Sequence, residues 1–149
     1  MCFRFRPLFR SFIVIGVLSV MCKTVVAKDI VIHVENVNTG LPGNIMVMLY
    51  EIDGFPKNHA KAIAINVIPV TNKKIIARFA AVPAEFAIKI LHDEDETGQV
   101  TKNWTGIMPA EGLGFSNGAR IRFGPPKYEH AKLKLEGSHS PITIKMIYP

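Results

Sequence analysis

The chain has 149 residues, with 18 Lys and Arg against 12 Asp and Glu, and only two cysteines. Four of the basic residues and both cysteines lie in residues 1–27, so residues 28–149 carry a formal charge of about +2 and no thiol. This composition excludes disulfides, thiolate metal sites and cysteine nucleophiles from residues 28–149, and it gives no argument for nucleic-acid binding.

Residues 1–27 have the pattern of a secretory signal peptide. Three arginines precede the apolar run SFIVIGVLSVMC, and the segment ends in TVVA, which is typical of a cleavage site. The apolar run is too short for a bilayer span, which needs roughly 20 residues. We therefore predict cleavage after Ala27, a single domain over 28–149 with no membrane span, and a periplasmic or secreted location. Retention of residues 1–27 as an uncleaved anchor is the alternative.

Apolar residues alternate with polar ones along most of residues 28–149. In DIVIHVEN, for example, Ile30, Ile32 and Val34 share one face, and Gly, Pro and Asn turn signals separate this run from the next. No stretch has the periodicity of an amphipathic helix. The pattern predicts an all-β fold, a single antiparallel β-sandwich of seven or eight strands. The expected strands cover residues 29–36, 44–51, 62–70, 73–80, 85–92, 119–123, 130–136 and 141–148.

Residues 93–118 form the exception, because they show little strand pattern over about 25 residues. A long irregular connection in a compact domain is usually functional or disordered. This one is rich in large apolar side chains, so we expect it to pack against the domain. These side chains are Trp104, Ile107, Met108, Leu113 and Phe115.

Several short motifs follow one another in this half of the chain. They are His92-Asp93 at the end of a strand, an acidic loop over 95–103, GIMPAE over 106–111, GFSN over 114–117, and GPP over 124–126. In this order the motifs resemble a family of bacterial secreted proteins, the domain of unknown function 2141 (DUF2141). The resemblance implies an Ig-like or transthyretin-like architecture, and it implies no particular activity.

The motif GFSNG also matches G-x-S-x-G, the nucleophile elbow of α/β-hydrolases. An elbow needs a strand, a sharp turn that exposes the serine, and then a helix. Here Asn117-Gly118 is a turn signal, and the following residues alternate as a strand would. We therefore interpret Ser116 and Asn117 as side chains that bond to backbone groups, with Gly118 supplying a positive φ.

The stretch DEDETGQVTKN resembles the first half of a calcium-binding loop. Calcium needs several oxygen ligands and a sharp turn at glycine, which Gly98 provides. Trp104 stands where a bidentate glutamate would close such a loop. The alternatives are a solvated acidic turn, or carboxylates that bind backbone amides or Lys102. The candidate metal ligands are Asp93, Asp95, Thr97, Gln99 and Asn103.

Three further side chains are candidates for ligand binding: His92, Glu111 and Trp104. His92 adjoins Asp93 but lies on the Phe86 face of its strand, where a buried, hydrogen-bonded histidine is the alternative. Glu111 either binds backbone amides or arginines, or lines a pocket. Trp104 either joins an aromatic platform or fills a cap over the sandwich. The other members of that platform would be Phe115, Phe123 and Tyr128.

Two functions remain from different classes. The first is an exported, non-enzymatic module that binds a ligand or an envelope protein. The second is a small periplasmic hydrolase or isomerase that uses His92, Asp93 and Glu111, which would need these three side chains to converge in an open cleft. No phosphate-binding loop, dinucleotide fingerprint or basic-aromatic strip is present. Calcium is the only cofactor that the sequence suggests.

Overall fold

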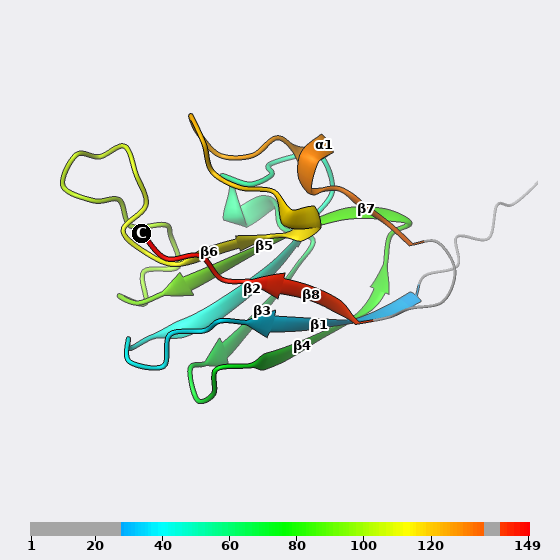
Figure 1. Cartoon of the computed structure of the whole chain (residues 1–149). Coiled ribbons are helices and arrows are strands. Elements are labelled where there is room, and N and C mark those ends of the chain that lie inside the picture. Colours follow the sequence, from blue (N-terminus) through cyan, green and yellow to red (C-terminus); the bar gives the residue numbers. More distant parts are fainter. Residues whose placement is uncertain (1–27, 136–140) are drawn as a thin grey trace, which may run out of the picture.

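Two β-sheets pack face to face in the computed structural model of the chain, which describes residues 28–135 and 141–149 (Figure 1). The smaller sheet has three strands in the order β4-β1-β8. Its strands β1 and β4 are antiparallel, whereas β1 and β8 are parallel. The bounds of these strands are Lys28–Glu35 for β1, Ile75–Val82 for β4 and Ile142–Lys145 for β8.

The larger sheet has five strands, four of them in the order β3-β2-β5-β6, and β7 also pairs with β5. All of these pairs are antiparallel. The strands are β2 Asn44–Tyr50, β3 Ala64–Pro69, β5 Glu85–Asp93, β6 Leu113–Phe115 and β7 Leu133–Lys134. Three single turns of helix connect them: η1 His59–Lys61, η2 Ser116–Gly118 and α1 Tyr128–Ala131.

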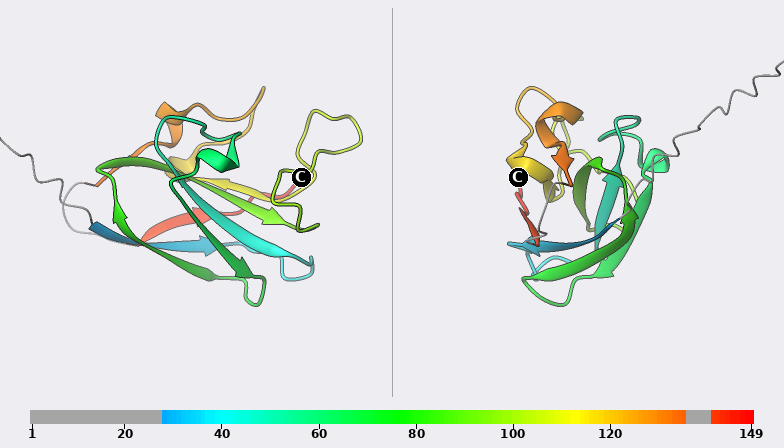
Figure 2. Two further views of the ribbon diagram at one scale, coloured as in Figure 1. Left: turned by 180° about the vertical axis from the view of Figure 1, so that it is seen from behind. Right: turned by 90° about the vertical axis from the view of Figure 1, so that its right-hand side faces the viewer.

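The main hydrophobic core lies between the two sheets. Strand β1 alternates, so Ile30, Ile32 and Val34 are buried there while the residues between them are less so. The five-stranded sheet also has a covered outer face, on which a second apolar cluster lies. Loops between the strands cover that face, and Figure 2 shows them on one side of the molecule. The cluster consists of Met46, Met48, Tyr50, Leu91, Leu113 and Phe115, with Phe55, Ala62, Val100, Ala119 and Ile121 packed against it.

The prediction of an all-β chain is confirmed, and both sheets are rich in antiparallel pairs. A wholly antiparallel arrangement is wrong, because β1 pairs with β8 in parallel. Parallel neighbours need a long crossover connection, and here nearly the whole described chain lies between these two strands. The predicted strand over 119–123 is also wrong, since it is an irregular loop.

Strand β6 was not predicted, and within residues 130–135 of the expected strand over 130–136 the regular structure is the end of α1 and the short β7. No helix in residues 28–135 and 141–149 is long and apolar enough to cross a membrane. The predicted signal peptide over 1–27 lies outside the described residues.

Gly43 shows how closely the chain approaches itself next to the end of β5. It has a φ of +94°, and a Cβ at this position would collide with the backbone carbonyl of Asp93. Gly118 also has a positive φ of +65°, but nothing lies within 4 Å of the position of its Cβ. The two glycines therefore differ in available space although both adopt a conformation that L-residues avoid.

We predict that Gly43→Ala lowers the free energy of unfolding by about 3 kcal/mol or more, because it combines backbone strain with a collision. Gly118→Ala is the matched control and should cost only about 1–2 kcal/mol, from strain alone. Urea denaturation of the two variants measures the difference. Equal losses would show that the close approach at Gly43 does not occur.

Candidate functional site

Three carboxylates gather where β5 ends. Asp93 is the last residue of β5, Asp95 follows in the next loop, and Glu111 precedes β6. The pairing of β5 with β6 continues in a bond from the His92 amide to the Gly112 carbonyl (2.9 Å), which brings Glu111 beside Asp93. One oxygen from each of the three carboxylates lies within 4.8 Å of the others. Asp93 and Glu111 are buried, whereas Asp95 is exposed.

The two aspartates accept hydrogen bonds from the loop that follows them. The amides of Thr97 and Gly98 donate to the two oxygens of Asp93, at 3.0 and 2.9 Å. The Thr101 hydroxyl donates to Asp95 at 2.6 Å, and the Thr97 amide also donates to it. The bond from Thr101, followed by that from Thr97, holds the pKa of Asp95 below its ordinary value. The aspartates therefore fold the acidic segment into a turn.

Glu111 binds two backbone amides that belong to different parts of the loop. It accepts from Glu94 at 3.0 Å and from Thr101 at 2.8 Å, so it ties the end of β5 to the segment beyond the turn. Burial raises the pKa of the Glu111 carboxyl, an effect that these two amides oppose. The sequence left open whether Glu111 binds backbone amides or arginines, or lines a pocket. In the structure it binds two backbone amides, and it also lines a pocket that Arg120 shares.

The predicted calcium ligands fit an ion poorly in this geometry. Calcium takes six to eight oxygens, and of the five predicted ligands only Asp93 and Asp95 belong to the acidic group. The Thr97 hydroxyl donates to the carbonyl of Gln99, and the side chain of Asn103 accepts from Thr105. Every oxygen of the two aspartates already accepts a hydrogen bond, as the carboxylate of Glu111 does. In the described residues the acids form no ion pair with Lys102.

The segment 101–110 is a hairpin that extends beyond the sheets (Figures 1 and 2). Its stem is closed by bonds from Asn103 to Met108 and from Ala110 to Thr101, both 2.8 Å. The expectation that all of 93–118 packs is wrong for the hairpin. Trp104 is 96% exposed, Ile107 79% and Met108 45%, whereas Leu113 and Phe115 are buried. The hairpin satisfies its own backbone, and its tip lies beyond any surface on which these side chains could pack.

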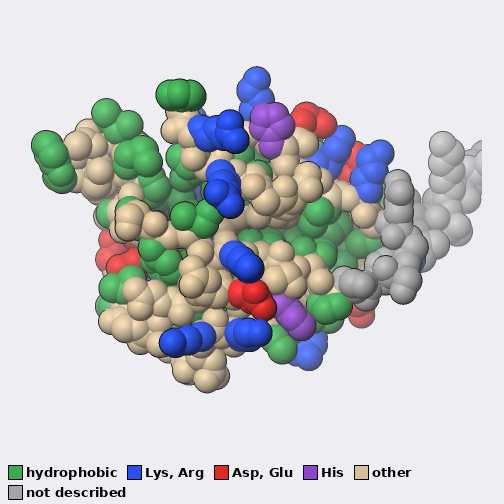
Figure 3. All heavy atoms as spheres, viewed as in Figure 1, with side chains coloured by type: hydrophobic (Ala, Val, Ile, Leu, Met, Phe, Trp, Pro, Cys, Tyr) green, Lys and Arg blue, Asp and Glu red, His purple; other side chains and the backbone are tan. Residues whose placement is uncertain are grey.

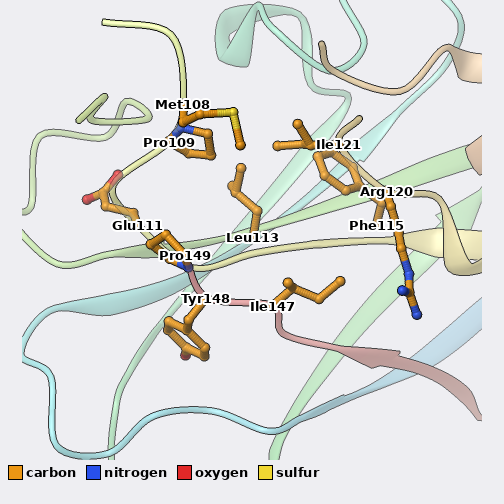
Figure 4. Close-up of a pocket in the computed structure, with 10 residues that line it drawn as sticks. All are labelled: Met108, Pro109, Glu111, Leu113, Phe115, Arg120, Ile121, Ile147, Tyr148 and Pro149. Carbon is orange, nitrogen blue, oxygen red and sulfur yellow. The ribbon is translucent and has the colours of Figure 1, made fainter. Parts of the chain in front are cut away.

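A pocket of about 310 Å³ opens at the base of this hairpin (Figure 4). It lies between the hairpin, β6, the loop after η2 and the end of the chain. In Figure 4 the carboxylate of Glu111 and the guanidinium of Arg120 lie on opposite sides of the pocket. Figure 3 shows apolar side chains on the hairpin and on this face, with Lys and Arg side chains beside them. The other lining residues are Met108, Pro109, Leu113, Phe115, Ile121, Ile147, Tyr148 and Pro149.

His92 is buried and bound on both ring nitrogens. The carbonyl of Pro42 can only accept, so Nε2 donates to it at 2.9 Å. Nδ1 then accepts from the Tyr148 hydroxyl at 2.9 Å, and the rings of His92 and Tyr148 meet edge to face. Because successive residues of a strand point to opposite faces, His92 and Asp93 leave β5 in opposite directions. The structure does not bring His92 together with Asp93 and Glu111.

Ser116 is fully buried, and its hydroxyl accepts from the Ile88 amide at 2.9 Å and donates to the Ala131 carbonyl. This is a structural serine, as predicted, although it bonds to β5 and α1 instead of its own turn. The aromatic platform does not form. Phe115 and Tyr128 both pack edge to face on Phe55, away from the exposed Trp104 and Phe123.

Two buried polar residues were not singled out from the sequence. Lys89 and His59 are 3% and 6% exposed, and they contact each other at 2.6 Å between Nζ and Nε2. The available signal was Lys89 itself, a lysine within the otherwise apolar run FAIKIL of a central strand. Nothing in the sequence places His59 beside it, because 30 residues separate the two.

We predict that Asp93→Ala lowers the free energy of unfolding by about 1–3 kcal/mol, because it removes the acceptor of the Gly98 amide and one of the two acceptors of the Thr97 amide. The exposed Asp95→Ala is the control and should cost less. Thermal unfolding with and without millimolar calcium measures both effects, and we expect calcium to leave the midpoint unchanged. A midpoint that rises with calcium would show that an ion displaces the amides. An unchanged midpoint in Asp93→Ala would remove the structural role.

Comparison with known proteins places the chain in one group. Residues 32–143 match the model of the family described as "Uncharacterized protein conserved in bacteria (DUF2141)". No curated protein matches the chain, and neither does any solved structure. The match covers most of the chain and includes every residue of the acidic group, the hairpin and the buried Lys89–His59 pair. The chain therefore belongs to the DUF2141 family of bacterial proteins.

Proposed function

We propose that this protein is an exported, non-enzymatic β-sandwich module, Ig-like or transthyretin-like in type, that binds a protein partner of the bacterial envelope. The contact surface would be the tip of hairpin 101–110 and the pocket at its base. The exposure of Trp104 is the observation that carries the proposal.

A tryptophan at 96% exposure gains almost none of the stabilisation that burial would give it, so its position does not serve the fold. Ile107, 79% exposed on the same hairpin, adds a second unburied apolar side chain. Contiguous exposed apolar side chains mark interaction sites, and tryptophan is enriched among residues that dominate binding energy. A partner that covers both side chains would recover this burial.

The pocket would provide the second half of the contact. Its volume of about 310 Å³ is at the lower end of ligand sites, and it suits one or two apolar side chains of a partner. Arg120 on its edge forms no ion pair within the described residues. A partner segment with an apolar side chain next to a carboxylate therefore fits the pocket best.

Hydrogen bonds fix the base of the hairpin, whereas the side chains at its tip are exposed. Glu111 binds the Thr101 amide, and Thr101 also bonds to Asp95 and to Ala110. A fixed base presents the apolar tip in one place, which lowers the entropy lost on binding. The alternative of a hydrolase or isomerase lacks such support, because His92 faces away from Asp93 and Glu111.

We predict that the double variant Trp104→Ala, Ile107→Ala loses its envelope partner without losing stability. Removal of two dominant side chains weakens binding by about 2 kcal/mol or more, which is roughly 30-fold. Immobilised protein would be mixed with envelope extract of the bacterium that encodes it, and the retained proteins quantified. Ile52→Ala, at a position 68% exposed outside the hairpin, is the matched control and should retain the same protein as the wild type. Equal retention by the double variant would contradict the proposal.

Export is a separate part of the proposal and has its own test. The arginines, short apolar run and VVA of residues 1–27 support cleavage after Ala27. Sequencing of the N-terminus of the protein in the periplasmic or medium fraction should begin at Lys28. Recovery of the chain only with an intact Met1 and in the membrane fraction would instead support the anchored form.

A further inference from the structure

The outer face of the five-stranded sheet buries an ammonium group against an imidazole. The Nζ of Lys89 lies 3.0 Å from the Pro56 carbonyl and 2.6 Å from Nε2 of His59. Nδ1 of His59 lies 2.7 Å from the Gly98 carbonyl. The pair therefore connects β5, the loop that contains η1, and the acidic turn after β5.

The partners decide which nitrogen of His59 carries the proton. A carbonyl can only accept, so Nδ1 donates to Gly98. Nε2 then accepts from the ammonium of Lys89, and this bond requires a neutral imidazole. A second proton on His59 would occupy Nε2, remove the acceptor, and set two positive charges against each other in a buried site.

Burial and the charged groups on the neighbouring elements raise or lower the pKa values of His59 and Lys89. Burial and then Lys89 lower the pKa of His59 below 6.5, while the bond to Gly98 and the charge of Asp93 oppose this. Burial also lowers the pKa of Lys89 to about 8, against the charge of Glu111, so Lys89 stays mostly protonated at neutral pH. On the η1 loop itself, Lys61 is paired with Asp53.

Both backbone polar groups of Gly98, its carbonyl and its amide, are bound by side chains. His59 binds its carbonyl, and Asp93 binds its amide at 2.9 Å. Three residues further on, Glu111 binds the Thr101 amide. The segment 97–101 forms no strand and no helix, so it is held against the sheet by these side-chain bonds and by the packing of Val100 on the outer apolar cluster. Segments held by so few bonds open at a lower free energy than the strands beneath them.

We propose that His59 and Lys89 form a proton-operated latch that holds segment 97–101 against the five-stranded sheet and releases it when His59 takes up a second proton. The closed state binds fewer protons than the open one, because His59 becomes protonated less readily when it is closed. Linkage then fixes the sign for His59: its contribution to the stability of the latch is fully present above the ordinary pKa of 6.5 and is lost as the pH falls below that value. This device does not depend on the proposed partner binding.

Amide hydrogen exchange at neutral and acidic pH tests the latch. After correction for the intrinsic pH dependence of exchange, protection of the Gly98 and Thr101 amides should fall at least about threefold between pH 7.5 and pH 5. Protection of the Ile90 amide in β5 should not change over that range. The ring resonances of His59, followed by NMR, should titrate together with the loss of protection.

His59→Gln separates protonation from simple loss of the side chain. Its amide can donate to Gly98 and accept from Lys89, and it does not titrate. We expect this variant to keep the segment protected at both pH values. The control His130→Gln, at an exposed histidine of α1, should behave as the wild type does. The latch is excluded if wild-type protection does not depend on pH, or if His59→Gln shows the wild-type dependence.

Discussion

The structure depends on the burial of β5 on both of its faces. All residues of this nine-residue strand except Glu85 are buried. One face meets the three-stranded sheet, as in any two-layer β fold. The other face is covered by irregular loops in place of a second sheet. Loops bring backbone amides and carbonyls that must find partners where water is excluded. The buried polar side chains of the molecule follow from that requirement.

With the exception of Ser116, each buried polar side chain of the described residues binds loop backbone. Asp93 and Glu111 accept from amides of the 94–101 segment, and Ser116 joins β5 to α1. Lys89 donates to the carbonyl of Pro56 in the η1 loop. Among the described residues no buried side-chain nitrogen or oxygen lacks a hydrogen bond. Bonds to charged groups contribute about 1.5–3 kcal/mol each, which is enough to order segments that have no strand or helix of their own.

The sequence revealed the parts of this fold that depend on local pattern. Alternation in β1 and the apolar run of β2 identified strands and their buried side chains, because successive residues of a strand point to opposite faces of the sheet. The sequence did not reveal how loops cover the second face of β5. The contacts of Lys89 with His59 and of Asp95 with Thr101 join residues that no local pattern connects. Trp104 was expected to pack because hydrophobicity reports a preference for burial, whereas its exposure results from the geometry of a hairpin that extends past the sheet.

The buried ionisable groups also explain how the base of the hairpin can be fixed and yet depend on pH. Replacing buried charged groups with apolar side chains often leaves a protein equally or more stable, so stability alone does not account for the buried ammonium of Lys89 and its neutral partner His59. A polar bond has an orientation and, with histidine, a protonation state that an apolar contact lacks. Glu111 and His59 hold the same loop from two sides, and protonation of His59 would remove the acceptor that its Nε2 offers to Lys89. The carboxylates therefore bind the loop while they are charged, and His59 binds it in the closed arrangement only while the imidazole is neutral. The exposed apolar tip of the hairpin continues directly from that loop.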